Sequence, residues 1–426
     1  MNKKVLVVTY YWPPAGGPGV QRWLKFVTYL RDFEIEPIVY IPENPNYPLT
    51  DTSLSDDVPE DIEIISRPIF EPYGLASIFS KKKTKRISSG IIQDKKQSWL
   101  EKLMLYIRGN FFIPDARRFW IMPSVKFLSG FIKQHNIDTV ITTGPPHSVH
   151  LIGLRLKQKT GVKWVADFRD PWTTIGYHDK LRLTKRSKEK HRQLEHMVLN
   201  NANQIVVTSF KTADEFKLIT TQPITVITNG YEFLNQAPAA DALDEKFTIS
   251  HIGSLLTGRN PKILWEVLSE LTKENKDFGE SLQIKLAGAV SEDVLEGIAG
   301  FGLSSKLHLL GYVPHKEALH LQRNSQLLLL IEIDAEETRG IIPGKLFEYM
   351  ATKRPIIALG PADADIKRII LDTGTGKFFG YQDKTVLKST ILSYFELFKQ
   401  GSLQIDPVRL EQYSRKELTK KLAALL

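Results

Sequence analysis

Short runs of apolar residues recur along the first half of the chain and predict the buried strands of a parallel sheet. Turn residues or stretches with helical spacing follow each run, as where Trp23, Phe26 and Leu30 recur at the helical period. The predicted strands are Val5–Thr9, Pro37–Ile41, Asp61–Ser66, Asp138–Thr143, Val162–Ala166, Gln204–Thr208 and Ile224–Thr228. The later helices predicted between them are His147–Thr160, Lys185–Asn200 and Lys211–Ile219.

The second half of the chain repeats this alternation after Asn235–Asp244, a polar segment rich in Ala and Pro that predicts a linker. Its predicted strands are Thr248–Ile252, Gln283–Ala287, Leu307–Leu309, Leu327–Ile331 and Pro355–Leu359. The pattern predicts an α/β protein with two doubly wound parallel sheets that face a central cleft. The expected domains are residues 1–234 and 235–406, and a last helix over 407–426 is expected to pack back on the first domain. Ligands of such sheets bind beyond the carboxyl ends of the strands.

Composition excludes several classes of site. The chain has no cysteine, which excludes disulfides, cysteine-ligated zinc and thiol catalysis and fits a reducing compartment. The apolar run at the start is too short for a signal peptide and is interpreted as the first strand. No run reaches the roughly 18 apolar residues of a membrane span. A cytoplasmic protein is expected, either free or peripheral on the inner membrane face.

The net charge of +9 is concentrated in one insertion, at about residues 67–123. Residues 67–120 carry 12 Lys and Arg but 4 Asp and Glu. Lys81–Arg86 is interpreted as a loop, and Trp99–Phe112 combines aromatic residues with Lys102 and Arg108. Cationic and aromatic residues together favour an anionic membrane surface. A nucleic-acid partner is not expected because no recognition fold is evident, and a solvated insertion remains the alternative.

The segment Ile341–Leu359 carries the clearest candidate chemistry. A Pro-Gly turn opens a short helix whose unpaired amide groups form an anion site. Lys345 and Glu348 share one face of that helix. A cation for phosphate beside a carboxylate for sugar hydroxyls suits a sugar nucleotide, and an ordinary αβ unit with a surface ion pair is the alternative.

Two further cations follow the first predicted strand of the second domain. Arg259 and Lys262 lie in the loop after Gly253 and at the start of the next helix. Two cations near an open helix N-terminus suit a diphosphate. With Lys345 at the mouth of the same predicted sheet, they form a candidate phosphate clamp.

The first turn of the N-terminal domain is rich in glycine. Gly16, Gly17 and Gly19 allow the backbone to approach a ligand closely. Arg22 stands where the dinucleotide fingerprint has its third glycine, which argues against NAD. A tight turn that only packs the helix is the alternative.

Other polar residues follow strands of the N-terminal domain. Asp167, Arg169 and Asp170 end one strand, where a functional group and a structural ion pair are both possible. His147 and His150 follow another strand, and either can contact an acceptor or cap and pack a helix. The acidic residues Glu332, Asp334, Glu336 and Glu337 have no metal-ligand spacing and are interpreted as a solvated loop.

Taken together, these pieces resemble family 4 glycosyltransferases of the GT-B fold. The resemblance rests on YYWPPAGGPGVQRWLKFVTYL, ADFRDPW, Asn229-Gly230, HIGSLLTGRNP, LHLLGYVPHKEALHLQRNSQLLLLI and IIPGKLFEYMATKRPIIAL, in that order. It implies transfer of a sugar from a nucleotide donor with retention at the anomeric carbon and without a metal. The donor is then expected mainly in the C-terminal domain and the acceptor mainly in the N-terminal one.

The resemblance assigns expected roles to individual residues. Gly16 and Gly17 would shape the donor diphosphate and acceptor pocket, and Arg259, with Lys262, would bind phosphate. Glu348 would hold the ribose hydroxyls.

The sequence departs from the family pattern at one position. Gly340 occupies the place of a glutamate that normally faces the transferred sugar. Glu336 or Glu337 is a possible substitute, and Lys345 is a candidate for part of the role.

The resulting hypothesis is a retaining glycosyltransferase that uses a UDP- or GDP-sugar and needs no cofactor. Its acceptor is expected to be a lipid-linked or surface glycan, positioned by Asp167, Asp170 or His147. The alternatives are a GT-B-shaped sugar-nucleotide epimerase and a non-catalytic basic protein that binds membrane or nucleic acid.

Overall fold

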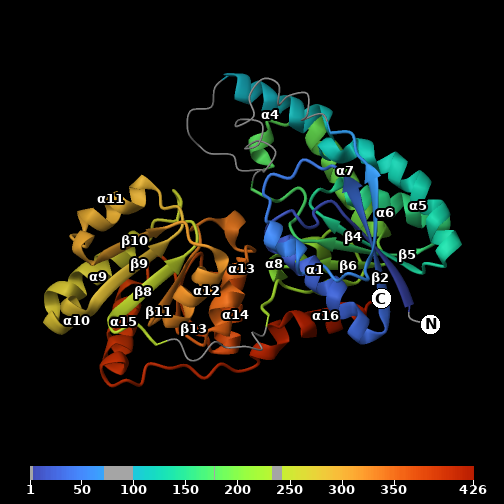
Figure 1. Ribbon diagram of the computed structural model, residues 1–426. Coiled ribbons are helices and arrows are strands. Elements are labelled where there is room, and N and C mark those ends of the chain that lie inside the picture. The colour runs from blue at the N-terminus through green and yellow to red at the C-terminus, as the bar shows by residue number, and fades with distance from the viewer. Residues whose placement is uncertain (1–2, 72–98, 177, 233–241) are drawn as a thin grey trace. The chain divides into compact units, whose positions relative to one another are not determined.

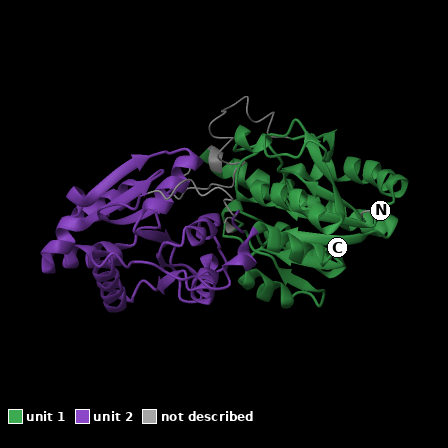
Figure 2. Ribbon diagram, turned by 60° about the horizontal axis from the view of Figure 1, so that its bottom comes forward, with its two compact units in different colours: residues 1–229, 415–426 green, residues 230–414 purple. Residues whose placement is uncertain are grey.

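The computed structural model describes residues 3–71, 99–176, 178–232 and 242–426 (Figure 1). The chain forms two compact units (Figure 2). Unit 1 comprises residues 1–229 and 415–426, and unit 2 comprises residues 230–414. Most of the predicted linker and the basic run Lys81–Arg86 lie outside the described residues.

Unit 1 is built on a seven-stranded parallel sheet with the order β3-β2-β1-β4-β5-β6-β7. All seven strands predicted for the first half are confirmed, with small shifts at their ends. Their bounds are β1 Lys3–Thr9, β2 Ile35–Glu43, β3 Glu63–Pro68, β4 Thr139–Gly144, β5 Lys163–Phe168, β6 Gln204–Val207 and β7 Ile224–Val226.

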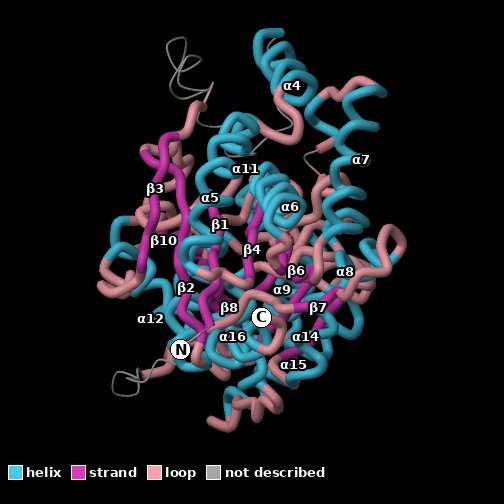
Figure 3. The backbone as a smooth tube through the Cα atoms, turned by 90° about the vertical axis from the view of Figure 1, so that its right-hand side faces the viewer, coloured by secondary structure: helices cyan, strands magenta, loops and turns pink. Residues whose placement is uncertain are grey.

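Alternation along β1 explains why helices cover both faces of this sheet. Leu6 and Val8 belong to the core under one set of helices, whereas Val5 and Val7 belong to the core on the opposite face. The first face is covered by α5 Ile121–His135, α6 Ser148–Thr160, α7 Lys185–Asn201 and α8 Phe210–Lys217. The opposite face is covered by α1 Pro18–Leu30 and α16 Arg415–Ala423, which pack on each other (Figure 1). The helices of the first face, α5 to α8, can be followed in Figure 3.

The end of the chain differs from its prediction. The continuous helix expected over 407–426 is a 3₁₀ turn at Leu410–Tyr413 followed by α16. Ser414 between them has an extended backbone, with φ −67° and ψ 143°, and this conformation ends the turn before α16 begins. Leu418 and Leu422 of α16 are buried in the core that α1 covers.

Unit 2 has a six-stranded parallel sheet with the order β10-β9-β8-β11-β12-β13. Its strands are β8 Phe247–Ile252, β9 Leu282–Ala287, β10 Leu307–Gly311, β11 Leu327–Ile331, β12 Ile356–Leu359 and β13 Gly376–Phe379. The first five were predicted, whereas the short edge strand β13 was not. The helices are α9 Lys262–Glu274, α10 Lys276–Ser281, α11 Glu292–Gly300, α12 His315–Asn324, α13 Gly344–Ala351, α14 Asp365–Thr373 and α15 Lys384–Lys399.

One helix of unit 1 stands apart from the layers just described. This is α4, Trp99–Phe111, which follows the stretch 72–98 in the basic insertion. Among the described residues, no helix is long and apolar enough to cross a membrane.

Candidate functional site

The glycine-rich turn between β1 and α1 is held by close packing. Gly17, directly before α1, has φ +113°, a conformation that favours glycine. A Cβ on Gly16 would lie 3.1 Å from Leu49 Cγ, and a Cβ on Gly19 would lie 1.8 Å from Arg169 Nη1. Arg169 therefore lies against the start of α1, and it also donates to the Gly144 carbonyl at 3.3 Å. Close packing at Gly16 and Gly19 and the positive φ of Gly17 therefore explain the glycines of this turn without a bound dinucleotide.

Asp167 is part of a buried network within unit 1. Its Oδ1 accepts from Arg22 Nη2 at 3.2 Å, and its Oδ2 accepts from Trp23 Nε1 at 2.8 Å and Thr143 Oγ1 at 2.7 Å. The Asp167 side chain is fully buried and the Arg22 side chain is 2% exposed. The structural interpretation thus describes Asp167, although its ion-pair partner is Arg22 and not Arg169. The predicted acceptor contact does not fit a carboxylate whose oxygens are already engaged in the core.

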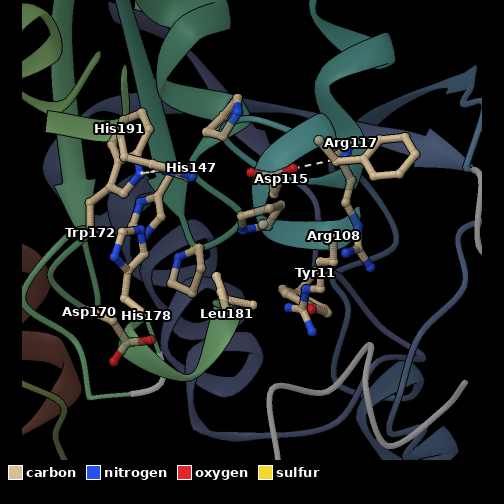
Figure 4. A pocket seen from close by; sticks show the side chains of 15 residues that line it. Tyr11, Arg108, Asp115, Arg117, His147, Asp170, Trp172, His178, Leu181 and His191 are labelled. Carbon is tan, nitrogen blue, oxygen red and sulfur yellow. Dashed lines mark hydrogen bonds between the residues drawn. The ribbon is translucent and has the colours of Figure 1, made fainter. Parts of the chain in front are cut away.

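His147 lines a cavity of about 180 Å³ at the carboxyl ends of β4 and β5 (Figure 4). Asp170, Trp172, His178 and His191 lie in its wall. The remaining lining residues are Tyr11, Arg108, Gly109, Phe112, Pro114, Asp115, Arg117, Pro145, Pro146 and Leu181. The structure thus brings two of the predicted acceptor residues, His147 and Asp170, to one cavity.

Burial lowers the pKa of three imidazoles at or beside this cavity, those of His147, His150 and His191, and so favours their neutral forms. Burial, with neighbouring His150, His178 and His191, lowers the pKa of His147 well below its usual value. Burial, with a further contribution from Arg169, lowers the pKa of His150 to about 3. The His147 ring stacks on Trp172 with centroids 4.8 Å apart. Within the described residues, neither ring nitrogen of His147 has a hydrogen-bond partner. A buried neutral imidazole without such partners can donate a hydrogen bond to a ligand hydroxyl from one nitrogen and accept one at the other.

Asp170 differs from Asp167 in its surroundings. It is partly exposed at the cavity. Burial raises the pKa of its carboxyl group, and the nearby Arg169 opposes that effect. Asp170 is therefore the carboxylate of this strand end that can face a ligand.

In unit 2, Lys345 of α13 reaches the end of β8. A Cβ on Gly253, which has φ +127°, would lie 2.5 Å from Lys345 Nζ. The same amine lies 3.2 Å from Nε2 of the buried His251. His251 Nδ1 lies 2.9 Å from the Leu329 carbonyl, so the Nδ1–H tautomer donates there and leaves Nε2 to accept from Lys345.

Arg259 joins the same cluster of charges. Arg259 Nη2 pairs with Glu332 Oε2 at 3.3 Å, and the Arg259 side chain remains 30% exposed. Burial lowers the pKa of Lys345 to about 8, with a further contribution from Arg259. Burial raises the pKa of Glu332, while Arg259 and Lys345 oppose that rise. The expected grouping of Arg259 with Lys345 is present, whereas Lys262 is an exposed first residue of α9.

Glu348 lies one turn along α13 from Lys345. Its Oε2 accepts from Gln322 Nε2 at 3.0 Å, and its Oε1 lies 3.2 Å from His315 Nε2. The carboxylate is held by two residues of α12 and its side chain is 29% exposed. Its predicted role at a ribose stays a prediction.

The acidic loop before α13 needs a correction. Glu332, predicted to be solvated, is 2% exposed and takes part in the Arg259–Lys345 cluster. Glu336, a proposed substitute for the glutamate missing at Gly340, is 79% exposed and pairs with Arg339. Sequence reasoning missed Glu332 because four acidic residues within six positions suggest a solvated loop. Its signal was its place directly after the buried strand β11.

An exposed apolar surface lies on and beside α4. We call it the α4 aromatic surface and define it by Trp99, Leu103, Tyr106, Ile107, Phe111, Phe119 and Phe70. Trp99 is 76% exposed and Phe111 63% exposed. The rings of Phe70 and Phe119 meet edge to face at 5.4 Å. Lys102 and Arg118 are exposed within the same part of the chain.

Comparison with known proteins agrees with this geometry. Residues 94–233 match the family model described as Glycosyltransferase Family 4. The resemblance to family 4 glycosyltransferases is confirmed. No curated protein matches the chain.

Several solved structures share the fold along nearly the whole chain. Anabaena Alr3699/HepE in complex with UDP-glucose has 14% identity and a TM-score of 0.58, with 99% of this chain and 98% of that chain covered. A mutant of S. aureus TarM in complex with Fondaparinux, alpha-GlcNAc-glycerol and UDP has 13% identity and a TM-score of 0.55, with 99% of both chains covered. A putative UDP-N-acetylglucosamine 2-epimerase from Listeria monocytogenes has 13% identity and a TM-score of 0.55, covering 100% and 95%. These likenesses confirm the GT-B fold.

Proposed function

We propose that this protein transfers a sugar, with retention at the anomeric carbon, from a nucleoside-diphosphate sugar to a carbohydrate acceptor. The observation that carries the proposal is the grouping of Arg259 and Lys345 beside the start of α13, with Glu348 one turn further on. Two cations and unpaired helix amides suit a diphosphate, and a carboxylate held by Gln322 suits the hydroxyls of a ribose.

The chemistry asked of this cluster is stabilisation of the leaving group. As the bond between the anomeric carbon and the diphosphate oxygen breaks, negative charge grows on the diphosphate. The Arg259 and Lys345 side chains and the first amides of α13 would offset that charge. The acceptor oxygen then bonds to the anomeric carbon, and its proton leaves with the diphosphate. No metal ion is required in this proposal.

The acceptor is assigned to the cavity of unit 1. The cavity wall combines aromatic and imidazole rings with the charged side chains of Arg108, Asp115, Arg117 and Asp170. Rings beside polar groups of both charges suit the faces and the hydroxyls of a sugar. His147 would exchange hydrogen bonds with an acceptor hydroxyl, and Asp170 would orient it. The proposal leaves Asp167 out of this role because its oxygens are engaged with Arg22, Trp23 and Thr143.

A membrane-associated acceptor, such as a lipid-linked or surface glycan, is part of the proposal. It is supported by the α4 aromatic surface, since exposed Trp and Phe side chains beside Lys102 and Arg118 suit an anionic lipid headgroup layer. The protein would then work on the cytoplasmic face of a membrane as a peripheral protein.

A thermal-shift panel with UDP, GDP, CMP, dTDP, NAD and a short oligonucleotide tests the donor class. A ligand at a hundredfold its Kd stabilises the folded state by about 2.7 kcal/mol. We expect one nucleoside diphosphate to raise the Tm of the wild type, and Glu348→Ala to lose most of that rise. A response only to NAD or the oligonucleotide would contradict the proposal.

An acceptor-free incubation separates transfer from the epimerase alternative. An epimerase would interconvert UDP-sugar isomers without any acceptor, whereas a transferase needs an acceptor to consume the donor. The third alternative, a non-catalytic basic protein, predicts binding to vesicles or nucleic acid with no nucleoside-diphosphate response.

A further inference from the structure

The least expected group in unit 2 is the pair formed by Lys345 and His251. A lysine amine usually extends into water, yet this one lies against Gly253 and within 3.2 Å of a buried, neutral imidazole. His251 is 1% exposed, and its other nitrogen is fixed by the Leu329 carbonyl of the adjacent strand β11. The imidazole is therefore locked in the orientation that offers Nε2 to the lysine.

Four charged or titratable groups surround the Lys345 amine, whose residue is partly exposed. Arg259 comes from the loop after β8, Glu332 follows β11, and Glu348 lies on α13 itself; with His251 on β8, these groups interact electrostatically with the amine. Glycine at position 253 places no side chain between the amine and the backbone of the β8–α9 loop. Gly253 has φ +127°, and the backbone of any other residue would be strained in that conformation.

We propose that His251 is a positioning residue that holds the Lys345 amine against Gly253, and that a nucleoside diphosphate binds this site only when that amine is protonated. The inference rests on the proposed function, because the anion is the diphosphate of the sugar donor. His251 itself does not touch the donor. It acts by accepting a hydrogen bond from the amine, which keeps the amine directed at the loop.

Such a site makes donor binding depend on pH in a defined window. Burial lowers the pKa of Lys345 to about 8, so the free site loses its proton as the pH rises through that value. The terminal phosphate of a nucleoside diphosphate ionises near pH 6 and does not change charge there. The Kd should therefore be nearly constant from pH 7.0 to 7.5 and then rise by up to about tenfold per pH unit above 8.

Calorimetric titration with UDP and GDP from pH 6.5 to 9.0 tests the inference. Lys345→Arg keeps its charge throughout, so its Kd should not rise with pH. His251→Leu removes the acceptor and should weaken binding at least tenfold at pH 7, with the rise in Kd beginning at lower pH. His251→Gln, which can place an oxygen near the position of Nε2, should recover most of the affinity.

Two glycine variants test the geometry without altering any charge. In Gly253→Ala the new methyl group would displace the Lys345 amine, which should weaken UDP or GDP binding at least tenfold and flatten the pH profile. Gly302→Ala is the matched control, because Gly302 also has positive φ, +75°, but has open space around it. Its binding should match that of the wild type.

The outcomes separate two failures. If neither nucleotide binds the wild type at any pH, the proposed function is contradicted. If one binds with a Kd that stays constant between pH 7 and 9, or if Gly253→Ala binds as well as Gly302→Ala, the inference alone is overturned. Should His251→Leu fail to fold, Lys345→Arg and Gly253→Ala still decide it.

Discussion

Asp167 and Asp170 are three positions apart at the end of one strand, yet Asp167 is a structural residue and Asp170 faces the cavity. The sequence places both carboxylates after a buried strand and gives no means of distinguishing them. Burial distinguishes them, because Asp167 points into the core toward Arg22, whereas Asp170 lies at the cavity with His147. Which side chains a strand end directs inward depends on tertiary packing.

Replacement of Asp167 should therefore affect stability. Asp167→Ala leaves the Arg22 guanidinium buried without its carboxylate, and loss of one partner of a buried ion pair costs about 3–5 kcal/mol. Denaturant unfolding should show a fall of that size in the free energy of unfolding. Asp170→Ala is the matched control and should change stability by less than about 1 kcal/mol, because burial already disfavours its charged form. Equal stability of the two variants would contradict the structural assignment of Asp167.

At the scale of elements, the sequence predicted most of the fold because parallel strands are buried on both faces and appear as continuous apolar runs. The edge strand β13 was not predicted because its four residues do not form a continuous apolar run: they include Lys377, and only Phe379 is buried. The phosphate cluster was also predictable in outline. β8 and β11 are neighbours, and β12, which follows α13, lies beside β11. The loop with Arg259 and the start of α13 with Lys345 therefore come to one edge of the sheet.

What the sequence could not predict is the burial of individual polar groups. Glu332 and His251 are in contact with the cluster only because β11 and β8 end side by side. Their burial follows from the packing of several loops, which no local pattern encodes. The cavity around His147 likewise combines segments that are distant in sequence, from Tyr11 to His191.

The exposed aromatic side chains of α4 should contribute to binding of anionic membranes. Trp99→Ser combined with Phe111→Ser should weaken binding to vesicles of phosphatidylglycerol and phosphatidylcholine by about tenfold or more, since burial of each large apolar side chain is worth about 1.5–3 kcal/mol. Binding should also weaken as salt is added. Co-sedimentation measures both effects.

A suitable control for this experiment lies directly after α8. Leu218→Ser removes an isolated apolar side chain that is 89% exposed in the same unit, and it should leave vesicle binding unchanged. Equal binding by the double variant and the wild type would remove the α4 aromatic surface from the proposal.

At the scale of the whole molecule, the polypeptide passes from unit 1 to unit 2 and then returns. The returning helix α16 contributes Leu418 and Leu422 to the core over α1. Lys163 of β5 also donates to the carbonyl of Leu425 at 2.8 Å. Unit 1 is thus completed by residues that follow the whole of unit 2 in the sequence.

Leu422→Ala should reveal how much unit 1 depends on this return. The side chain is fully buried, and truncating a buried leucine typically costs about 2–5 kcal/mol. The free energy of unfolding of unit 1, measured by denaturant titration with tryptophan fluorescence, should fall by that amount. Lys420→Ala, on the exposed side of α16, should stay within about 0.5 kcal/mol of the wild type. If Leu422→Ala also stays within about 0.5 kcal/mol of the wild type, the stability of unit 1 does not depend on α16.

The position of α16 has a consequence for biosynthesis. While residues 230–414 are being synthesised, the apolar side chains of α1 that share a core with Leu418 and Leu422 have no α16 to cover them. The core of unit 1 can therefore be completed only after α16 has been synthesised. A chain that stops within unit 2 would leave this apolar face of α1 exposed, and an exposed apolar face favours association with other apolar surfaces.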